Sequence, residues 1–379
     1  MSKPLESQDH SARRARRRAH TRKIGHTMAA ASLLPFGLAV DAEAAAAKGE
    51  RAKPANPDDG TMQFGVDIDS VKKTQALGAP IAYGTLWVGP WTQKYGWATI
   101  EAQLKEARTR GVTPVINWWY WGDDISPNCV EHGCDDARQH VHKDKATWTR
   151  LSHELADLID RTSGHRGAIV VLETEFNKNG IETYQPFDGF LVEQMKIFHQ
   201  KPNIKVAIGF GNWGREHWNR FALAVAECDF LGTQLLQSSV RDSKTYMNAV
   251  DTLVSGAKEL QKKFAKPSLV IDLALSSYPE AKYAEYQADV VKELFERLPE
   301  LKQAGVQGVI WRQVSDDPKF DTSNYHGVAE RYWGLLHADG SPKPAFQPFV
   351  IGVQAEANHT PAPASAGPSA KAPNTPARR

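Results

Sequence analysis

Short apolar segments alternate with longer amphipathic segments through most of the chain. Each apolar segment has the length of a strand, and each amphipathic one repeats its apolar residues at the three- and four-residue steps of a helix. Several of the helix-like segments end in glycine just before the next strand, as helix C-termini commonly do. The expected strands cover residues 64–69, 81–88, 113–121, 168–177, 204–213, 230–237, 268–277 and 306–314.

Regular alternation of strand and helix predicts a parallel sheet. Eight such units over about 290 residues match a (β/α)8 barrel in number and in size. The alternative is an open doubly wound sheet, which would carry a glycine-rich phosphate-binding turn after its first strand. The segment FGVDIDSVKK has no such turn. We therefore predict an α/β fold consisting of a single-domain (β/α)8 TIM barrel.

The two ends of the chain differ in composition from the barrel region. Residues 1–47 combine a basic stretch, an apolar run and small residues, which is the order of a secretory signal peptide. The apolar run is too short to span a membrane, so no integral membrane segment is expected after cleavage. A polar linker follows at 48–62, the expected barrel domain covers 63–354, and a disordered Pro/Ala-rich tail covers 355–379.

A signal peptide implies a secreted or periplasmic protein. The paired arginines in RRARRRAHTRK match a twin-arginine signal only loosely, so the export route stays open. A basic disordered arm is the alternative interpretation of the first residues.

The charge distribution argues against nucleic-acid binding. The net charge of +2 hides a basic first segment, with eight Lys or Arg and two acidic residues in residues 1–23, so the remaining chain is mildly acidic. Such a body lacks the basic stripe of a nucleic-acid surface. We expect a monomer.

The three cysteines fit an exported protein. Cys129 and Cys134 bracket a four-residue loop, and a disulfide between them is expected in an oxidising compartment. Cys228 is left over and is expected to be a buried thiol. The alternative for the first two is a metal site with the nearby histidines, although their spacing is not a usual zinc pattern: His132, His140 and His142.

One expected strand carries a carboxylate where an apolar residue belongs. In VIDLALSS the large aliphatic residues Ile271, Leu273 and Leu275 alternate, so we expect them to face the surrounding helices. Asp272 then points into the barrel. Buried carboxylates are costly unless they are paired or used, so Asp272 is a candidate functional residue.

Other acids follow the same pattern on the first and fourth strands. Asp67 and Asp69 are expected to point inward, and Glu173, Glu175 and Asn177 are expected to share one face. Residues at the carboxyl ends of barrel strands line the active-site mouth. Glu175 and Asp272 therefore form the expected functional pair. For Asp67 and Glu173 a structural role is an open alternative, in which the carboxylate pairs with backbone groups or with an arginine such as Arg312.

Two acids across a sugar-sized gap are what cleavage of a glycosidic bond requires. One protonates the leaving oxygen, and the other attacks the anomeric carbon or activates water. The chain also has eleven tryptophans, whose faces stack on sugar rings. Eight of them fall near expected strand ends or loops: Trp87, Trp91, Trp118, Trp119, Trp121, Trp213, Trp311 and Trp333.

Three segments near the end of the barrel region resemble the C-terminal half of the (β/α)8-barrel retaining glycoside hydrolases, the clan of cellulases, mannanases and xylosidases. They are KPSLVIDLALSSYP, GVQGVIWRQVSDDP and YWGLLHADGSPKPAF. The resemblance implies that Glu175, in Thr174-Glu175-Phe176-Asn177, is the acid/base. It implies that Asp272 is the nucleophile and that Trp311 is the tryptophan beneath the sugar.

The chain departs from that clan at two of these positions. Thr174 replaces the asparagine that helps to bind the sugar 2-hydroxyl, and Asp272 replaces a glutamate. Carboxyl groups of retaining pairs lie about 5–5.5 Å apart, and those of inverting pairs about 6.5–9.5 Å apart. The resemblance favours retention. The shorter side chain of Asp272 leaves three other outcomes open: inversion, compensation by a backbone shift, or a barrel that binds sugar without cutting it.

The remaining site predictions concern contacts with a carbohydrate substrate, the expected partner of the chain. Trp119 and Trp121 join Trp311 as expected stacking platforms. No metal or organic cofactor is expected. The candidate hydroxyl contacts are Asn177, Gln234, Gln313 and Asp69.

Three other functions compete with a glycoside hydrolase. A non-catalytic glycan-binding barrel would bind sugar after loss of Glu175. A metal-dependent hydrolase would use Asp67, Asp69 and the histidines, but no histidine lies at an inward strand position. A lytic lyase would need a Tyr/His pair that the pattern does not show.

Overall fold

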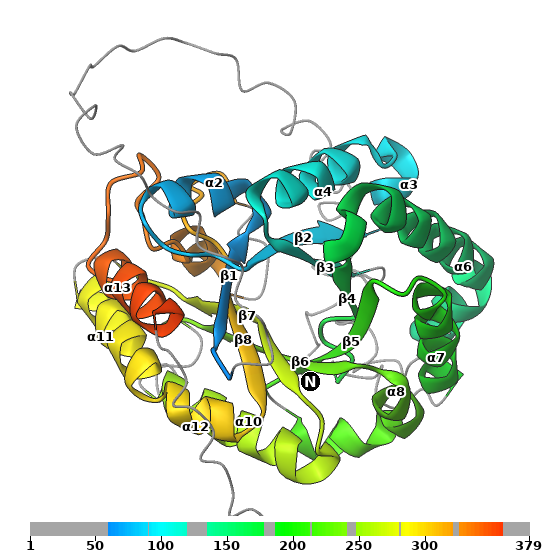
Figure 1. Ribbon diagram of the computed structural model, residues 1–379. Coiled ribbons are helices and arrows are strands. Elements are labelled where there is room, and N and C mark those ends of the chain that lie inside the picture. The colour runs from blue at the N-terminus through cyan, green and yellow to red at the C-terminus, as the bar shows by residue number, and fades with distance from the viewer. Residues whose placement is uncertain are drawn as a thin grey trace, which may run out of the picture. The chain divides into compact units, whose positions relative to one another are not determined.

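The eight strands form one closed parallel barrel in the order β1 to β8, so the predicted (β/α)8 TIM barrel is confirmed (Figure 1). The computed structural model describes residues 60–89, 91–119, 135–177, 186–212, 214–240, 248–279, 282–320 and 326–358. The predicted signal peptide, Trp121, Cys129 and Cys134 lie outside the described residues. The predictions for these residues therefore remain predictions.

The strands are short, and most of their residues are buried. They are β1 (Gln63–Asp67), β2 (Tyr83–Val88), β3 (Thr113–Trp118), β4 (Ala168–Leu172), β5 (Ile204–Gly211), β6 (Phe230–Gln237), β7 (Ser268–Leu275) and β8 (Val306–Trp311).

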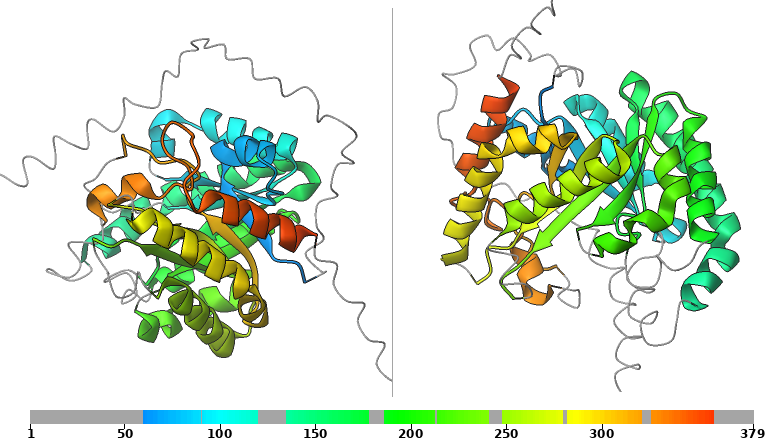
Figure 2. Two further views of the ribbon diagram at one scale, coloured as in Figure 1. Left: turned by 90° about the vertical axis from the view of Figure 1, so that its left-hand side faces the viewer. Right: turned by 90° about the horizontal axis from the view of Figure 1, so that it is seen from below.

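Helices surround the barrel on its outer side, as the three views show, and α13 lies beside α11 (Figures 1 and 2). The helices are α2 (Ile68–Ala76), α3 (Trp91–Tyr95), α4 (Ala98–Arg110), α6 (Asp135–Ser163), α7 (Pro186–His199), α8 (Ala222–Glu227), α10 (Ala249–Phe264), α11 (Lys282–Glu296), α12 (Leu298–Gln303) and α13 (Phe346–Ala357). In the described part of the chain, none has the length and apolar character needed to cross a membrane.

Two apolar clusters make up the core. The larger lies between the strands and the helices. The smaller fills the barrel interior, and Tyr83 and Phe230 pack against it. Its buried members are Val115, Ile169, Val171, Ala207, Leu269, Ile271 and Ile310. Because this cluster fills the interior, the polar side chains of the strand ends lie at its carboxyl-terminal side.

The barrel region begins and ends a few residues away from the predicted boundaries. Met62, placed in the linker by its sequence, is buried in the core at 3% exposure. The last helix runs to Ala357, into the predicted tail. Cys228 is a buried free thiol, as expected, and burial raises its pKa to about 12.

The prediction that Asp69 points into the barrel is wrong. Strand β1 ends at Asp67, and α2 begins at the next residue without a loop. The Asp67 carboxylate caps this helix by accepting a hydrogen bond from the Ser70 amide at 2.9 Å. Asp69 therefore lies in the first turn of α2, exposed to solvent and within 3.3 Å of the Gln103 side-chain nitrogen.

The predicted alternation also fails in the middle of β7. Thr233 of β6 pairs with Val270, but the next residue of β6, Gln234, pairs with Asp272, so β7 carries an extra residue. A bulge of this kind re-aims the side chains next to it. Ile271, expected to face the helices, belongs instead to the interior cluster with Leu269.

Candidate active site

Asp272 is a buried carboxylate, 2% exposed, with a cation beside it. The Arg312 guanidinium, which follows the end of β8, forms an ion pair with it. Burial raises the pKa of the Asp272 carboxyl, the Arg312 charge opposes that rise, and the Glu175 carboxylate adds to it. The inward placement predicted for Asp272 therefore agrees with the structure, and its partner is an arginine.

Glu175 lies on a tight turn and not on the extended strand that its sequence predicted. Strand β4 ends at Leu172, and Glu173 takes a left-handed backbone conformation with φ of 51°. Residues 174–177 then form a turn. The shared face predicted for Glu173, Glu175 and Asn177 assumed an extended strand, and β4 ends before all three residues.

Backbone contacts with β5 hold this turn in place. The Gly209 amide donates to the Glu173 carbonyl at 3.0 Å, and the Phe176 amide donates to the Gly209 carbonyl at 3.2 Å. A side chain at Gly209 would meet the Thr174 carbonyl oxygen at 2.2 Å, so only glycine fits there.

Two side chains anchor the far end of the turn. The Phe176 ring packs in the core against Phe210 at 4.3 Å between ring centroids. Asn177, 2% exposed, accepts a hydrogen bond from the Gly211 amide at 2.7 Å and donates to the Gly211 carbonyl at 3.0 Å. Asn177 therefore joins the turn to β5, a placement that departs from its predicted contact with a sugar hydroxyl.

Gln234 links the two acids. Its side-chain amide donates to Glu175 Oε1 at 2.6 Å, and its backbone lies opposite Asp272 in the sheet register. Glu175 is partly exposed, whereas Gln234 and Asp272 are buried. The ends of β4, β6 and β7 thus bring a partly exposed acid and a buried acid to the same end of the barrel. Gln234, expected to contact a hydroxyl, contacts the acid in this structure.

Two tryptophans lie near Arg312. The Arg312 guanidinium carbon lies 5.2 Å from the ring centroid of Trp87 on β2. Trp119, directly after β3, meets Trp87 edge to face with centroids 5.8 Å apart. Trp119 is partly exposed and stays the candidate stacking platform of the described residues. The strand alternation that places Ile310 inside also places Arg312 inside. The sequence named Arg312 only as a possible partner of a structural acid.

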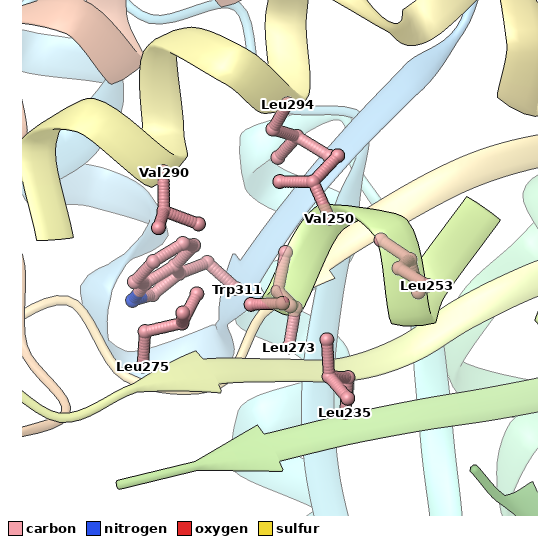
Figure 3. A pocket seen from close by; sticks show the side chains of 9 residues that line it. Leu235, Val250, Leu253, Leu273, Leu275, Val290, Leu294 and Trp311 are labelled. Atoms are coloured by element: carbon pink, nitrogen blue, oxygen red, sulfur yellow. The ribbon is translucent and has the colours of Figure 1, made fainter. Parts of the chain in front are cut away.

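Trp311 does not lie where the resemblance placed it. It is 1% exposed and packs on the outer side of the barrel, beside Leu273 and Leu275 of β7 and Val290 of α11 (Figure 3). Its indole nitrogen donates to the Trp333 carbonyl at 3.1 Å. The expectation of a sugar platform at Trp311 is therefore corrected: alternation along β8 turns Trp311 toward the helices when Ile310 and Arg312 face inward.

The other predicted acids and amides have local partners. The second oxygen of Asp67 accepts a hydrogen bond from the Val314 amide at 3.1 Å, so Asp67 fits the structural alternative. Burial raises the pKa of Asp67. The Gln313 side-chain amide, partly buried, donates to the Ser315 carbonyl at 2.5 Å. Within the described ranges, no group of three His, Cys, Asp or Glu side chains is arranged to hold a metal ion.

Comparisons with known proteins add information on the fold. No protein-family model matches the chain, and no curated protein does. A GH5_18 glycoside hydrolase from Bifidobacterium longum subsp. infantis superposes with a TM-score of 0.55 at 13% identity, over 78% of this chain and 79% of that one. An exo-β-1,4-mannosidase from Opitutaceae bacterium strain TAV5 gives a TM-score of 0.58 at 13% identity, over 80% and 61%. A fungal β-1,4-galactanase gives 0.54 at 13% identity, over 77% and 99%.

These proteins share the fold of this chain, and each is described as a glycoside hydrolase. Identity of 13% establishes a shared architecture and leaves residue roles to be argued from this chain's own side chains. The chain is therefore similar in fold to the (β/α)8-barrel glycoside hydrolases, which confirms, at the level of the fold, the resemblance seen in its sequence.

Proposed function

We propose that the chain is a glycoside hydrolase that cleaves O-glycosidic bonds of a polysaccharide or oligosaccharide, with Glu175 as the acid/base and Asp272 as the nucleophile. The observation that carries the proposal is the Gln234 link, which brings a partly exposed acid and a buried acid to one end of the barrel. The placement of each acid suits one role. Glu175 has solvent access for exchanging its proton, and Asp272 has a cation beside it.

The proposed reaction has two steps. First, an Asp272 oxygen bonds to the anomeric carbon as the bond from that carbon to the leaving oxygen breaks, and the proton of Glu175 passes to the leaving oxygen. Then Glu175 takes a proton from water, the water oxygen bonds to the anomeric carbon, and the bond to Asp272 breaks. The products are a free reducing end and the restored carboxylate.

The bulge in β7 supports retention of the anomeric configuration. Asp272 has a shorter side chain than the usual glutamate, which by itself would widen the gap between the acids. The extra residue at Ile271–Asp272 is a backbone adjustment at that position, where the Asp272 carboxylate pairs with Arg312 and is influenced by the charge of Glu175.

The substrate contacts are proposals of the same kind. Trp119 supplies a partly exposed ring at the mouth, and Gln313 follows the end of β8. Related folds support a carbohydrate: one GH5_18 structure from Bifidobacterium longum subsp. longum is a complex with Manβ1-4GlcNAc. Export of the chain as a secreted or periplasmic monomer, with a Cys129–Cys134 disulfide, completes the proposal.

The first experiment compares wild type with Glu175→Gln and Asp272→Asn on a panel of β-mannan, β-galactan, xylan and their oligosaccharides. We expect release of reducing ends by wild type, a loss of about 10²–10⁴-fold for Glu175→Gln and a loss of about 10⁴-fold or more for Asp272→Asn. Asp289→Asn, an exposed acid on α11, is the matched control and should behave like wild type. Full activity in both site variants would refute the assignment.

Azide separates the two roles. In Asp272→Ala, azide takes the place of the nucleophile, so the glycosyl azide should have the anomeric configuration opposite to the substrate. In Glu175→Ala, azide attacks the glycosyl-enzyme and the product should keep the configuration. Exchanged outcomes would reverse the roles, and a wild-type first product of inverted configuration by NMR would make Asp272 the general base.

One observation favours a second function, a non-catalytic glycan-binding barrel. Burial raises the pKa of Asp272 and so disfavours the ionised form, which is the form able to attack carbon. This function predicts saturable binding of an oligosaccharide by calorimetry, no release of reducing ends, and binding that survives Glu175→Ala.

A further inference from the structure

The course of the backbone at the end of β8 places Arg312 next to Asp272 of β7. Ile310 belongs to the interior cluster, Trp311 packs outside, and Arg312 is next in the alternation, on the inner side. The bulge in β7 brings Asp272 to the same place. Two local features, each on its own strand, therefore produce one ion pair.

In the surroundings of Asp272, the ion pair with Arg312 is what favours ionisation of the Asp272 carboxyl. The carboxylate is almost without solvent contact, and burial favours the neutral acid. Among the described residues, the charged groups that act on it are Arg312, of opposite charge, and Glu175, of like charge. Gln234, opposite it in β6, is neutral. Arg312 is therefore the group that favours the ionised form, which is the form able to attack carbon.

Trp87 gives the guanidinium a second contact that does not depend on Asp272. The ring and the guanidinium carbon are 5.2 Å apart, and the ring itself is fixed by its edge-to-face contact with Trp119. Cation–π attraction persists when the carboxylate loses its charge. In the proposed reaction, the bond from Asp272 to the anomeric carbon consumes that charge, and Arg312 would otherwise lose its partner. The tryptophan therefore holds Arg312 ready for the second step.

We propose that Arg312 is a positioning residue that keeps Asp272 ionised and aimed, and that Trp87 holds the Arg312 guanidinium throughout the reaction. The inference rests on the proposed function for its meaning in catalysis. It assigns to Trp87 a role in supporting the nucleophile, distinct from the sugar platform expected at Trp119.

The test follows the titration of Asp272 directly, without any substrate. Full-length protein is labelled with [13Cγ]aspartate, the Asp272 signal is identified by its loss in Asp272→Asn, and its chemical shift is followed with pH. We expect the midpoint to rise by about one to three pH units in Arg312→Met. Arg312→Lys, which keeps the charge but lacks the planar fork, should give a smaller rise. Trp87→Leu should shift the midpoint in the same direction, by less than Arg312→Met does.

The controls keep the result interpretable. Arg150→Met removes an exposed arginine of α6 and should leave the midpoint unchanged. If Arg312→Met fails to fold, by circular dichroism, the comparison uses Arg312→Lys and Trp87→Leu. An Asp272 midpoint equal to that of wild type in folded Arg312 variants would overturn the proposal, and an unchanged midpoint in Trp87→Leu would remove the Trp87 part.

Activity gives a second, separable readout. On any glycan that wild type cleaves, the acidic limb of kcat against pH should move upward in Arg312→Lys with little change in KM, because the substrate contacts remain. Shifted titration without glycan cleavage in wild type would keep the positioning role and refute the proposed function. Cleavage with an unshifted titration would refute only the positioning role.

Discussion

Two aspartates whose side chains are little exposed lie at the same end of the barrel and each pair with a cation, yet their surroundings differ. Asp316 accepts hydrogen bonds from Lys343 Nζ at 2.6 Å and from the Gly334 amide at 3.0 Å. Lys343 also donates to Ser277 Oγ at 2.8 Å, just after β7. The side chains of Lys343 and Asp316 are 1% and 6% exposed, so this pair is closed to solvent and well hydrogen-bonded.

In the proposed active site the cation is the more exposed partner. The side chain of Arg312 is 21% exposed and that of Asp272 is 3% exposed, and the like charge of Glu175 acts on Asp272 in addition to its cation. Burial raises the pKa of both aspartates, and a cation opposes the rise in each. The two pairs differ in their other partners. The Asp316 pair also contacts the residues just after β7, whereas Asp272 has the second acid, Glu175, near it. Removing one partner of a closed pair leaves an uncompensated buried charge, which is strongly destabilising. The pair beside Glu175 is the one that we propose for chemistry.

The largest expected effect breaks the closed pair. Lys343→Met leaves Asp316 buried without its cation, and we expect a loss of about 3–5 kcal/mol in the free energy of unfolding. Urea denaturation measures this loss. Lys319→Met, at an exposed lysine in the same loop, is the matched control and should stay within about 0.5 kcal/mol of wild type. A small loss in Lys343→Met would show that the pair is not structural.

The same variant has a defined pH dependence. Without Lys343, burial raises the pKa of Asp316 further than in wild type. A carboxyl with a raised pKa in the folded state contributes stability at low pH, which is lost as pH rises through that pKa. The deficit of Lys343→Met relative to wild type should therefore be smaller at pH 5 than at pH 8. A deficit independent of pH would mean that the charge of Asp316 is not its cause.

The next effect concerns the turn that carries Glu175. Gly209→Ala would place its methyl carbon 2.2 Å from the Thr174 carbonyl oxygen, so the turn has to move. We expect a loss of about 1–3 kcal/mol in stability and, since a small misplacement of a reacting group is costly, a fall in kcat of up to about 10²-fold. Denaturation and initial rates on a cleaved glycan measure the two effects.

Gly189→Ala is the control for this substitution. Nothing lies within 4 Å of the new carbon at Gly189, in helix α7, so alanine should stabilise that helix by up to about 1 kcal/mol and leave kcat unchanged. Equal kcat values in both variants would separate the turn from the chemistry.

The sequence predicted the architecture because its alternation of strand and helix repeats eight times, and errors of a few residues at each boundary do not change that count. It also placed Glu175 and Asp272 near the carboxyl ends of their strands, which meet at one end of the barrel. The details of that edge had no comparable signal. The left-handed backbone at Glu173 and the bulge before Asp272 are single-residue departures from regular geometry, and a hydrophobic pattern that assumes a period of two cannot record them.

Two assignments failed for related reasons. At Asp69 the alternation of β1 was carried on through a junction where a helix begins without a loop. At Trp311 the resemblance to a clan placed the ring beneath the sugar, whereas the structure turns the next residue, Arg312, to the inner side. A lone charged residue beside a large aromatic one at a strand end left two orientations possible, and the surrounding packing selected one of them.

The smallest expected effect distinguishes the two faces of β8. Trp311→Phe removes the hydrogen bond to the Trp333 carbonyl and part of the packing against Leu273 and Leu275, so we expect a loss of about 1–2 kcal/mol in stability. Because the ring lies behind the barrel wall, KM for a cleaved glycan and the titration of Asp272 should not change. Trp119→Ala should do the reverse, raising KM by about tenfold through a lost sugar contact, with a smaller cost in stability because the ring is partly exposed. A rise in KM in Trp311→Phe as large as that in Trp119→Ala would return Trp311 to the mouth of the barrel, and would mean that the inner and outer sides of β8 had been exchanged.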